Sequence, residues 1–424
     1  MVLNQEKFIL KMMMNNKYIK VIQTKKYKDI NLYLRFSLYA KENLKEELLL
    51  LSKLIGDRSK KYPEKSLMTK VKDMLYGISL DTSYKARTNI MTLTLHYAFI
   101  NPKFLDVSID NYIDYINETL NNTLINESTL KEAKDSLIDV IKRSEEKPNS
   151  YSSQRFNEIV SKDNRDFDIY YLGKKIIPTV KKISVKELNA LYKQIINKAQ
   201  LNIYLCGDLD NKTIKLLTSY DFSKRKEVIC KPSKYKYHKI KNVVDRKDMG
   251  QSVLYSIYST PYNKAHKDFF AWFVGNCFLG NAPVSLLFEE VREKLSLCYS
   301  IGVIDYKNDG LVRIATYIDA DKKDVVLKEI NKQIQRIINK DYDLNKLEMS
   351  KLLLTNTLMS TYDDLDVLVD YYHESFLSNF NYSLEEYCKE IMKINADDLV
   401  RVFKEYKPYF NYMLLGKNNG KEVL

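Results

Sequence analysis

The sequence predicts an α+β fold with two homologous α+β domains, each an antiparallel-rich sheet packed with helices, related by internal duplication. Three observations support this prediction. Strand-like hairpins are separated by runs of helices, which is typical of α+β proteins rather than of doubly wound parallel sheets. The same order of patterns occurs in both halves of the 424 residues. Two short segments of the first half also resemble segments of the second half.

The first half contains patterns for both element types, since period-two alternation predicts strands and apolar spacing of three to four predicts helices. The expected strands are residues 17–23, 31–38, 78–84, 91–99 and 201–206. The third and fourth of these form a hairpin around a polar turn. The expected helices are residues 44–55, 65–75, 110–120, 129–143, 152–161 and 185–197.

The second half repeats this order. The expected strands are residues 252–258, 298–306, 310–317 and 410–415, and the middle two again form a hairpin. The expected helices are residues 266–278, 283–294, 322–338, 345–359, 365–377 and 396–406. Pro283 stands in the first turn of its predicted helix, where its missing N–H does no harm.

Two local matches indicate a duplication. MLYGISLDTSY (Met74–Tyr84) resembles LCYSIGVIDYK (Leu297–Lys307), and each follows a helix and opens a strand pair. IYLCGDLD (Ile203–Asp210) resembles YMLLGKNN (Tyr412–Asn419). A repeat of this length predicts two related domains rather than a solenoid. We expect domains at residues 1–221 and 249–424, joined by a lysine-rich linker at 222–248.

The composition restricts the class of protein. Hydrophobic residues make up 45% of the chain, with 33 Tyr and 16 Phe, which excludes global disorder. No stretch approaches the roughly 20 apolar residues of a membrane span. The start has an apolar patch interrupted by Lys11 and no small-residue cleavage site. The five cysteines lack CxxC spacing, so neither a disulfide framework nor a thiolate zinc site is expected. We expect a soluble, cytoplasmic protein.

The charge is strongly basic, at +13 from 68 Lys and Arg against 55 Asp and Glu. Lysines are spread along the whole chain, and residues 231–241 interleave them with tyrosines. Such a stretch can suit a nucleic-acid backbone. No zinc-finger, helix-turn-helix or aromatic RNA-binding signature accompanies it, so we expect no nucleic-acid partner. The charge favours acidic peptides or an acidic partner chain.

The segment with chemical content is FLGNAPVSLLFEEVREKLSLCYS (Phe278–Ser300), a small-residue turn followed by a helix and a strand. Arg292 and Tyr299 are seven residues apart, so a helix ending between them can bring both side chains to one cleft. A guanidinium can grip carbonyls or a carboxylate, and a phenol can donate to a developing oxyanion. From spacing alone, the alternative of a surface arginine and a half-buried tyrosine stays open.

This segment resembles the second-domain signature of the pitrilysin/insulinase metallopeptidase family, and the resemblance extends over the whole chain in layout. The matching residues are Gly280, Ser285, Leu287-Phe288, Glu289-Glu290, Arg292-Glu293-Lys294, Leu297 and Tyr299-Ser300. The resemblance implies paired, duplicated α+β domains. It also implies that Arg292 and Tyr299 hold substrate near the metal, and it assigns Gly280 and Asn281 to substrate binding.

The resemblance fails at the zinc site. Peptidases of this family carry His-x-x-Glu-His on an early helix, where two histidines bind zinc and the glutamate activates water. Aligned on Lys60–Pro63, the corresponding residues here are Leu49, Ser52 and Lys53. None can serve as ligand or base in the usual way, and no two of the four histidines have ligand spacing. Glu132 is a candidate for the distal ligand, but without histidines no metal site is expected.

A division of labour follows from the resemblance. Some bacterial members work as two chains, one with zinc and the other with the arginine and tyrosine. This chain looks like the zinc-less subunit of such a peptidase, inactive alone, which would supply Arg292 and Tyr299 to a zinc-bearing homologous partner that cleaves peptides. The alternative is a degenerate scaffold or peptide-binding module with no role in catalysis. An independent peptidase is a third and weaker interpretation.

Overall fold

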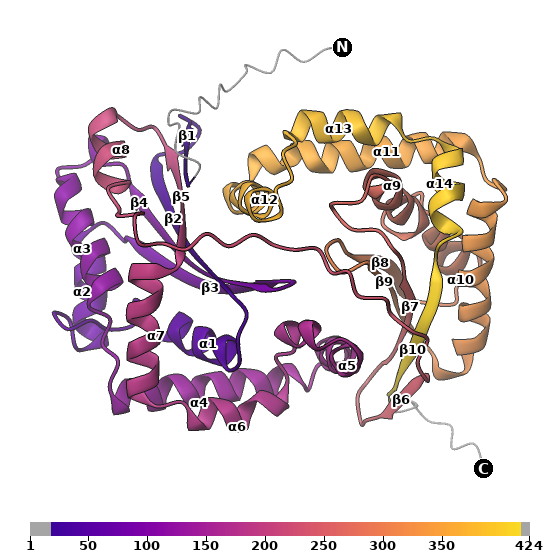
Figure 1. Cartoon of the computed structure of the whole chain (residues 1–424), viewed down its shortest axis with the longest axis horizontal. Helices are drawn as coiled ribbons and strands as arrows, with labels where there is room; N and C mark the ends of the chain where they lie inside the picture. Colours follow the sequence, from indigo (N-terminus) through magenta and orange to yellow (C-terminus); the bar gives the residue numbers. More distant parts are fainter. Residues whose placement is uncertain (1–17, 417–424) are drawn as a thin grey trace. The chain divides into compact units, whose positions relative to one another are not determined.

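The computed structural model of the protein describes residues 18–416 (Figure 1). The apolar start of the chain and the last residues of the second repeated segment lie outside this part. The described residues form two compact units that are not continuous in sequence. The first unit consists of residues 18–141 and 174–229, and the second of residues 142–173 and 230–416.

The first unit is built on a five-stranded sheet in the order β1-β5-β2-β4-β3. Only β1 and β5 pair in parallel, and the other neighbours are antiparallel. Its strands are β1 Ile19–Gln23, β2 Asp29–Tyr39, β3 Ser79–Arg87, β4 Ile90–Ile100 and β5 Gln200–Gly207. Its helices are α1 Leu44–Leu54, α2 Lys65–Met74, α3 Ile109–Asn121, α4 Glu127–Ser144, α6 Ile177–Lys182, α7 Val185–Lys198 and α8 Asn211–Leu217, with the end of α4 crossing the boundary between the units.

The second unit is built on a five-stranded sheet in the order β6-β10-β7-β9-β8. Its strands are β6 Val243–Arg246, β7 Ser252–Ser259, β8 Ser300–Tyr306, β9 Leu311–Ile318 and β10 Lys407–Leu415. Its helices are α5 Pro148–Asp163, α9 Phe269–Gly280, α10 Lys323–Ile338, α11 Leu344–Met359, α12 Leu365–Ser378, α13 Leu384–Lys393 and α14 Ala396–Phe403.

The two sheets have the same connectivity. Each has a first, short strand paired in parallel with its last strand, and an antiparallel order through to the edge strand of the hairpin. Both hairpins, β3–β4 and β8–β9, fall where the alternating pattern predicts them. The predicted α+β fold with twin domains is therefore confirmed.

Helix α5 covers one face of the second sheet although it belongs to the first half of the chain. Phe156, Ile159 and Val160 pack in one buried cluster with apolar residues of β7 and β10. The opposite face of the sheet is covered by α9, α10 and α14 around the fully buried Trp272. Residues 142–173, which the repeat pattern assigns to the domain at 1–221, therefore lie in the second compact unit.

The expected linker at 222–248 contains a strand that the sequence pattern does not reveal. Strand β6 pairs in parallel with β10, from Val243 opposite Tyr412 to Arg246 opposite Leu415. The pairing uses backbone groups at the sheet edge, and Val244 is exposed, so no alternating apolar pattern arises.

The segment expected to be helical from Pro283 is also different. Residues 281–284 form a turn, and a π-helical segment, η4, covers Phe288–Lys294.

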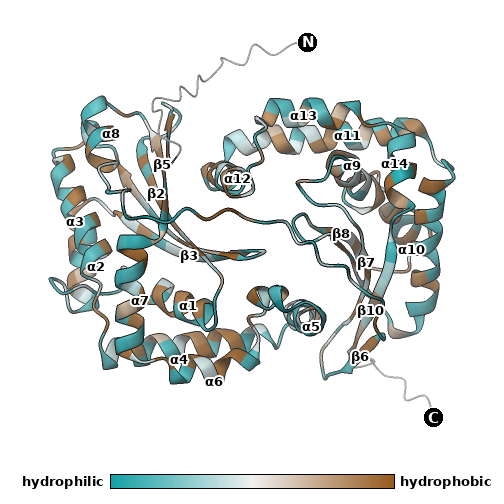
Figure 2. Ribbon diagram, viewed as in Figure 1, coloured by the Kyte–Doolittle hydropathy of each residue, from teal (hydrophilic) through white to brown (hydrophobic). Residues whose placement is uncertain are grey.

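Figure 2 colours the described chain by hydropathy. None of the helices in residues 18–416 has the length and apolar composition needed to cross a membrane.

Candidate functional site

The π-helical segment η4 carries Arg292 to an exposed position in the second unit. Its wide turn closes with the Leu295 N–H donating to the Glu290 carbonyl, and the Leu297 N–H donates to the Val291 carbonyl. Ser296 between them has a left-handed backbone conformation, with φ of 49°. Such wide turns occur often at functional sites. Here the turn separates Arg292 from the strand that follows.

Arg292 is held by two contacts with its own segment. Its guanidinium lies 4.6 Å from the centroid of the Phe288 ring, and Nη1 lies 3.5 Å from Glu293 Oε1. The Arg292 side chain is 41% exposed. An ion pair this exposed contributes little to stability. The guanidinium can therefore exchange Glu293 for a carboxylate or carbonyl of a bound peptide at small cost.

Tyr299 directly precedes the edge strand β8. Its backbone N–H donates to the Tyr317 carbonyl of β9 at 3.2 Å, which fixes the main chain, while the side chain is 70% exposed. Strand β8 pairs with β9 on one side and is the last strand of its sheet. A phenol with this much freedom can reach a group bound along the β8 edge.

The Cys298 thiol is influenced by Arg292 and also by Lys322, a residue that the sequence pattern did not single out. Burial raises the pKa of the Cys298 thiol, while a hydrogen bond to Thr316 and the positive charges of Arg292 and Lys322 act in the opposite direction. Lys322 forms an ion pair with Asp319 at 2.9 Å. This hydrogen-bonded carboxylate raises the Lys322 pKa, and the Tyr299 phenol contributes in the same direction. Arg292 and Lys322 both act on the Cys298 thiol, and Tyr299 acts on Lys322, so these three residues are named together here as the Arg–Tyr–Lys patch.

Gly280 and Asn281 lie against β8. A Cβ at Gly280 would come within 2.5 Å of the Val303 side chain, so only glycine allows this approach. The Asn281 amide oxygen accepts a hydrogen bond from the Val303 N–H at 2.9 Å. Both residues therefore hold the turn that precedes η4 against β8, the strand that follows η4. Their predicted role in substrate binding stays a prediction.

The acidic pair of the signature anchors η4 to its neighbours. Glu289 pairs with Lys346 of α11, and Glu290 accepts from Lys294 at 2.6 Å and from Arg336 of α10 at 3.2 Å. The Lys294 hydrogen bond, with smaller contributions from Arg336, holds the pKa of Glu290 below its ordinary value against the effect of burial. These ion pairs fix η4, which carries Arg292, against α10 and α11.

The three residues aligned with the zinc motif lie on α1 in the first unit. The Ser52 hydroxyl donates to the Leu49 carbonyl at 2.9 Å, and Lys53 Nζ donates to Ser136 Oγ of α4 at 3.0 Å. A serine hydroxyl bound to its own helix and an ammonium without a lone pair are not zinc ligands. This donor set does not fit the metal that the family resemblance implies.

Glu132, the candidate for a distal ligand, is engaged in an ion-pair group. Arg58 donates to it at 2.8 Å, and Lys65 lies 3.1 Å away. These two partners lower the pKa of Glu132. Within residues 18–416, no three His, Cys, Asp or Glu side chains cluster in a way that would hold a metal ion. His96 instead shares a hydrogen bond with Asn31 at 2.9 Å in the first sheet.

Comparison with known proteins agrees with this architecture. The family described as "Peptidase M16 inactive domain" matches residues 182–354. A relative from Bacillus subtilis (strain 168), named "Probable inactive metalloprotease YmfF", is 22% identical over 409 residues, which are 93% of this chain and 95% of the relative.

Two solved structures share the fold. A conserved protein from Enterococcus faecalis V583 has a TM-score of 0.85 and 22% identity, covering 95% of this chain and 97% of that one. The periplasmic protease PqqL from Escherichia coli has a TM-score of 0.65 and 14% identity, and it covers 95% of this chain but 45% of that one. Residues 182–354 therefore resemble the inactive domain of M16 peptidases, the family of pitrilysin and insulinase, and the twin α+β fold is shared with both solved structures.

Proposed function

We propose that this chain is the non-catalytic subunit of a two-chain zinc peptidase, in which Arg292 and Tyr299 act on substrate held by a zinc-bearing homologous partner. One observation carries the proposal: Arg292 and Tyr299 are exposed, whereas Leu49 and Lys53 stand at the positions of the two histidine ligands and Ser52 at that of the glutamate base. A chain with substrate-binding groups but without zinc ligands can use those groups in a complex with a second chain that supplies the zinc ligands.

The chemistry required of each group is simple. The planar fork of Arg292 binds a peptide carbonyl or a terminal carboxylate and orients it. The Tyr299 hydroxyl donates to the carbonyl oxygen as negative charge develops there, which works only at about 3 Å from that oxygen. None of these roles needs a metal in this chain.

The length relation with PqqL supports a two-part peptidase. The fold of this chain accounts for less than half of that protease, whose remaining length would suffice for a second portion of similar size. Two chains of this length can provide in a complex what one longer chain provides alone. The relative named as probably inactive supports a non-catalytic role, because it covers nearly the whole chain.

The decisive experiment uses the full chain mixed with a homologous chain that carries His-x-x-Glu-His. We expect peptide hydrolysis from the mixture and little from either chain alone. Arg292→Ala and Tyr299→Phe should each lower kcat/KM of the mixture by the equivalent of about 2–4 kcal/mol. Arg246→Ala and Tyr382→Phe are matched controls, since both residues are exposed elsewhere in the second unit.

Two outcomes would count against the proposal. If the mixture cleaves peptide and both site variants leave its turnover unchanged, the patch does not act in the reaction. If zinc binds the isolated chain stoichiometrically and it hydrolyses peptides alone, the division between two chains is wrong.

A second candidate is a peptide-binding scaffold with no role in catalysis, favoured by the position of Tyr299 beside the edge strand β8, where Asn281 binds the Val303 N–H. An extended peptide can add to such an edge as a further strand. This candidate predicts peptide affinity that the zinc-bearing chain does not change, and no hydrolysis that depends on both chains. A cytoplasmic location is also proposed, and it is supported by the cysteine pattern of the sequence, five residues without CxxC spacing.

A further inference from the structure

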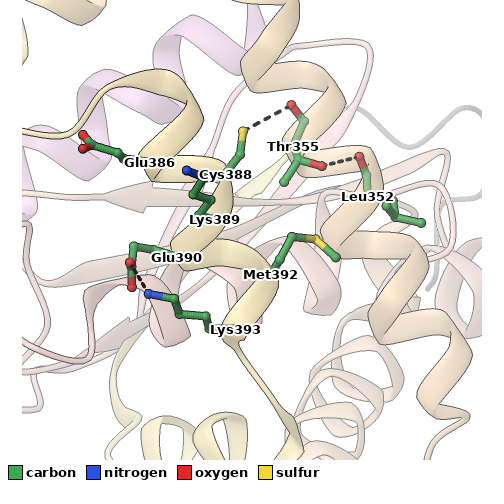
Figure 3. Close-up of a pocket in the computed structure, with 8 residues that line it drawn as sticks. All are labelled: Leu352, Thr355, Glu386, Cys388, Lys389, Glu390, Met392 and Lys393. Carbon is green, nitrogen blue, oxygen red and sulfur yellow. Dashed lines mark hydrogen bonds and ion pairs between the residues drawn. The ribbon is translucent and has the colours of Figure 1, made fainter. Parts of the chain in front are cut away.

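The groove between helices α11 and α13 has a balanced charge (Figure 3). Its charged lining residues are Glu386, Lys389, Glu390 and Lys393, so acidic and basic groups cancel. Glu390 also pairs with Lys393 at 2.5 Å. This lining therefore selects no ligand by its charge, whereas the face of the second sheet next to α5 contains a cation without a counter-charge.

That cation is Arg313, a buried residue of β9. It is 7% exposed, and a guanidinium stays charged in proteins. Its guanidinium carbon lies 4.6 Å from the centroid of the Tyr255 ring, 4.8 Å from that of Phe156 and 5.7 Å from that of Tyr306. The three rings come from β7, α5 and β8 and pack in one cluster, named here the aromatic cage.

The aromatic cage supplies no negative charge. Within residues 18–416 the Arg313 guanidinium forms no hydrogen bond or ion pair, and its Nε is buried without an acceptor. Contacts with ring faces offset part of the cost of burying a cation. A buried charge is nevertheless normally paired with an opposite one. The side chain therefore has donors available for an anion.

Two carboxylates of the same unit bind other groups. Asp245 accepts from Arg155 at 2.6 Å, and Asp309 accepts from the Tyr170 hydroxyl at 3.2 Å. Burial raises the pKa of the Tyr306 phenol to about 12, and Asp309 acts in the same direction, whereas Arg313 acts in the opposite one. Asp309 thus lies near the aromatic cage, yet it is not an ion-pair partner of the guanidinium.

The cover that α5 provides on this face ends at Arg313. Residues directly opposite each other on neighbouring strands share a face of the sheet. Arg313 stands between Ile257 of β7 and Ile304 of β8. Ile257 packs in the cluster with α5 and is 1% exposed, whereas Ile304 is 41% exposed. A ligand can therefore approach the guanidinium over β8.

The uncovered part of the face continues along β8 and β9. Its residues are exposed or half-buried, and they are named here the β8–β9 strip: Ser300, Gly302, Ile304, Ala315 and Tyr317. From the Ser300–Tyr317 pair to the Ile304–Arg313 pair it extends about 13 Å, the length of four extended residues. Burial raises the pKa of the Tyr317 phenol, and Arg313 acts against it, so the charge of Arg313 reaches the strip.

We propose that Arg313 binds a carboxylate of a peptide that lies on the β8–β9 strip. The planar fork of a guanidinium matches a carboxylate. The surrounding rings keep the local dielectric low, which strengthens the attraction. Ile304 and Ala315 offer apolar contact to the body of a peptide, which a small inorganic anion would not use. The inference rests on the proposed function in one respect, that the chain binds peptides.

Calorimetric titration of the full chain with three peptides tests which group is recognised. All are N-acetylated octapeptides of alanine and serine. The first has a free C-terminal carboxylate, the second a C-terminal amide and one glutamate, and the third a C-terminal amide and one glutamine. The first or the second should bind at least about tenfold more tightly than the third. The tighter of the two shows whether a C-terminus or an acidic side chain is bound.

Substitutions at Ile304 test the position of the site and leave the aromatic cage intact. Ile304→Glu places a carboxylate directly opposite Arg313, where opposite charges on neighbouring strands attract. Compared with the matched control Ile304→Gln, it should raise the urea midpoint and weaken binding of the preferred peptide at least about tenfold. Both variants should fold, because Ile304 is exposed.

Removing the cation is the complementary test. Arg313→Met should bind all three peptides with the low affinity of the glutamine peptide. Arg246→Met, at an exposed position of β6, removes the same charge elsewhere in the second unit and should keep the preference.

Three results would overturn the inference. Equal affinity of the three peptides for the wild type would show that no carboxylate is recognised. Equal urea midpoints and equal peptide affinities of Ile304→Glu and Ile304→Gln would show that Arg313 cannot be reached from the strip. Binding of inorganic phosphate as tightly as the preferred peptide would exclude a site built for peptides. All these measurements use the chain without a zinc-bearing partner, so they succeed or fail separately from the hydrolysis test of the proposed function.

Discussion

Replacing Asp245 by alanine is expected to release α5 from the second sheet. Asp245 on β6 accepts from Arg155 of α5 at 2.6 Å and 3.2 Å, and from the hydroxyls of Tyr151 at 3.1 Å and Tyr412 at 3.2 Å. Its pKa is lowered by Arg155 although burial acts in the opposite direction, so the carboxylate is charged at neutral pH. The substitution leaves the half-buried guanidinium with Glu158 as its remaining partner.

The size of the effect follows from these contacts. Breaking a buried ion pair by removing one partner costs about 3–5 kcal/mol. The side chains of Arg155 and Asp245 are 23% and 17% exposed, and Glu158 still neutralises the arginine. We therefore expect a loss of about 2–4 kcal/mol, less than for a fully buried pair.

Hydrogen exchange read by mass spectrometry measures the effect locally. Amides of residues 148–163 should exchange about 30-fold to several hundred-fold faster, since each 1.4 kcal/mol is a factor of ten. Amides of residues 127–141 in the first unit should keep their rates. Arg246→Ala on the same strand, where the side chain is exposed, is the control. Unchanged protection of α5, or equal loosening of both units, would refute the assignment of α5 to the second unit.

Two further predictions concern stability. Gly310 has φ of +69°, and a Cβ there would lie 2.6 Å from the Thr260 carbonyl oxygen, so Gly310→Ala should lower the free energy of unfolding by about 1–3 kcal/mol in urea titration. Gly302→Ala, where the nearest atom is 3.8 Å away, should change it by less than about 0.5 kcal/mol, and equal effects would contradict the steric reasoning. The pKa of Glu290 is lowered in the folded chain, so its contribution is complete above the unfolded pKa and is lost as pH falls through the folded value. The urea midpoint should fall more from pH 6 to pH 3 in the wild type than in Glu290→Gln, and parallel curves would contradict this.

Much of the fold could be predicted from local patterns. Strands such as β2 and β4 alternate or stay apolar along their length, and both hairpins were expected at their observed places. The elements that were not predicted either lack an alternating or helical apolar pattern or are marked only by a local signal such as a helix cap. Strand β6 is short and pairs through its backbone at an edge. Helix α13 was not expected, although Ser383 and Glu386 form a capping box, which is a signal visible in the sequence.

The candidate site could be predicted only in part. Arg292 and Tyr299 were singled out from spacing and resemblance, and the structure exposes both beside the β8 edge. Lys322 was missed because it follows the β8–β9 hairpin and acts on Cys298, 24 residues earlier, only in the folded chain. The π-helical turn that orients Arg292 has no sequence period that would distinguish it from an ordinary helix. The position of α5 depends on partners such as Asp245, 90 residues from Arg155, which no local pattern reveals.

The placement of α5 has a consequence for synthesis on the ribosome. When residues 148–163 leave the exit tunnel, the surface that will receive them does not yet exist. Asp245 follows Arg155 by 90 residues, and Tyr409, which donates to Asp163, follows it by 246. Until Tyr409 is translated, the apolar side of this helix stays without part of its native cover, so we expect α5 to dock late in folding or to be protected by a chaperone until then.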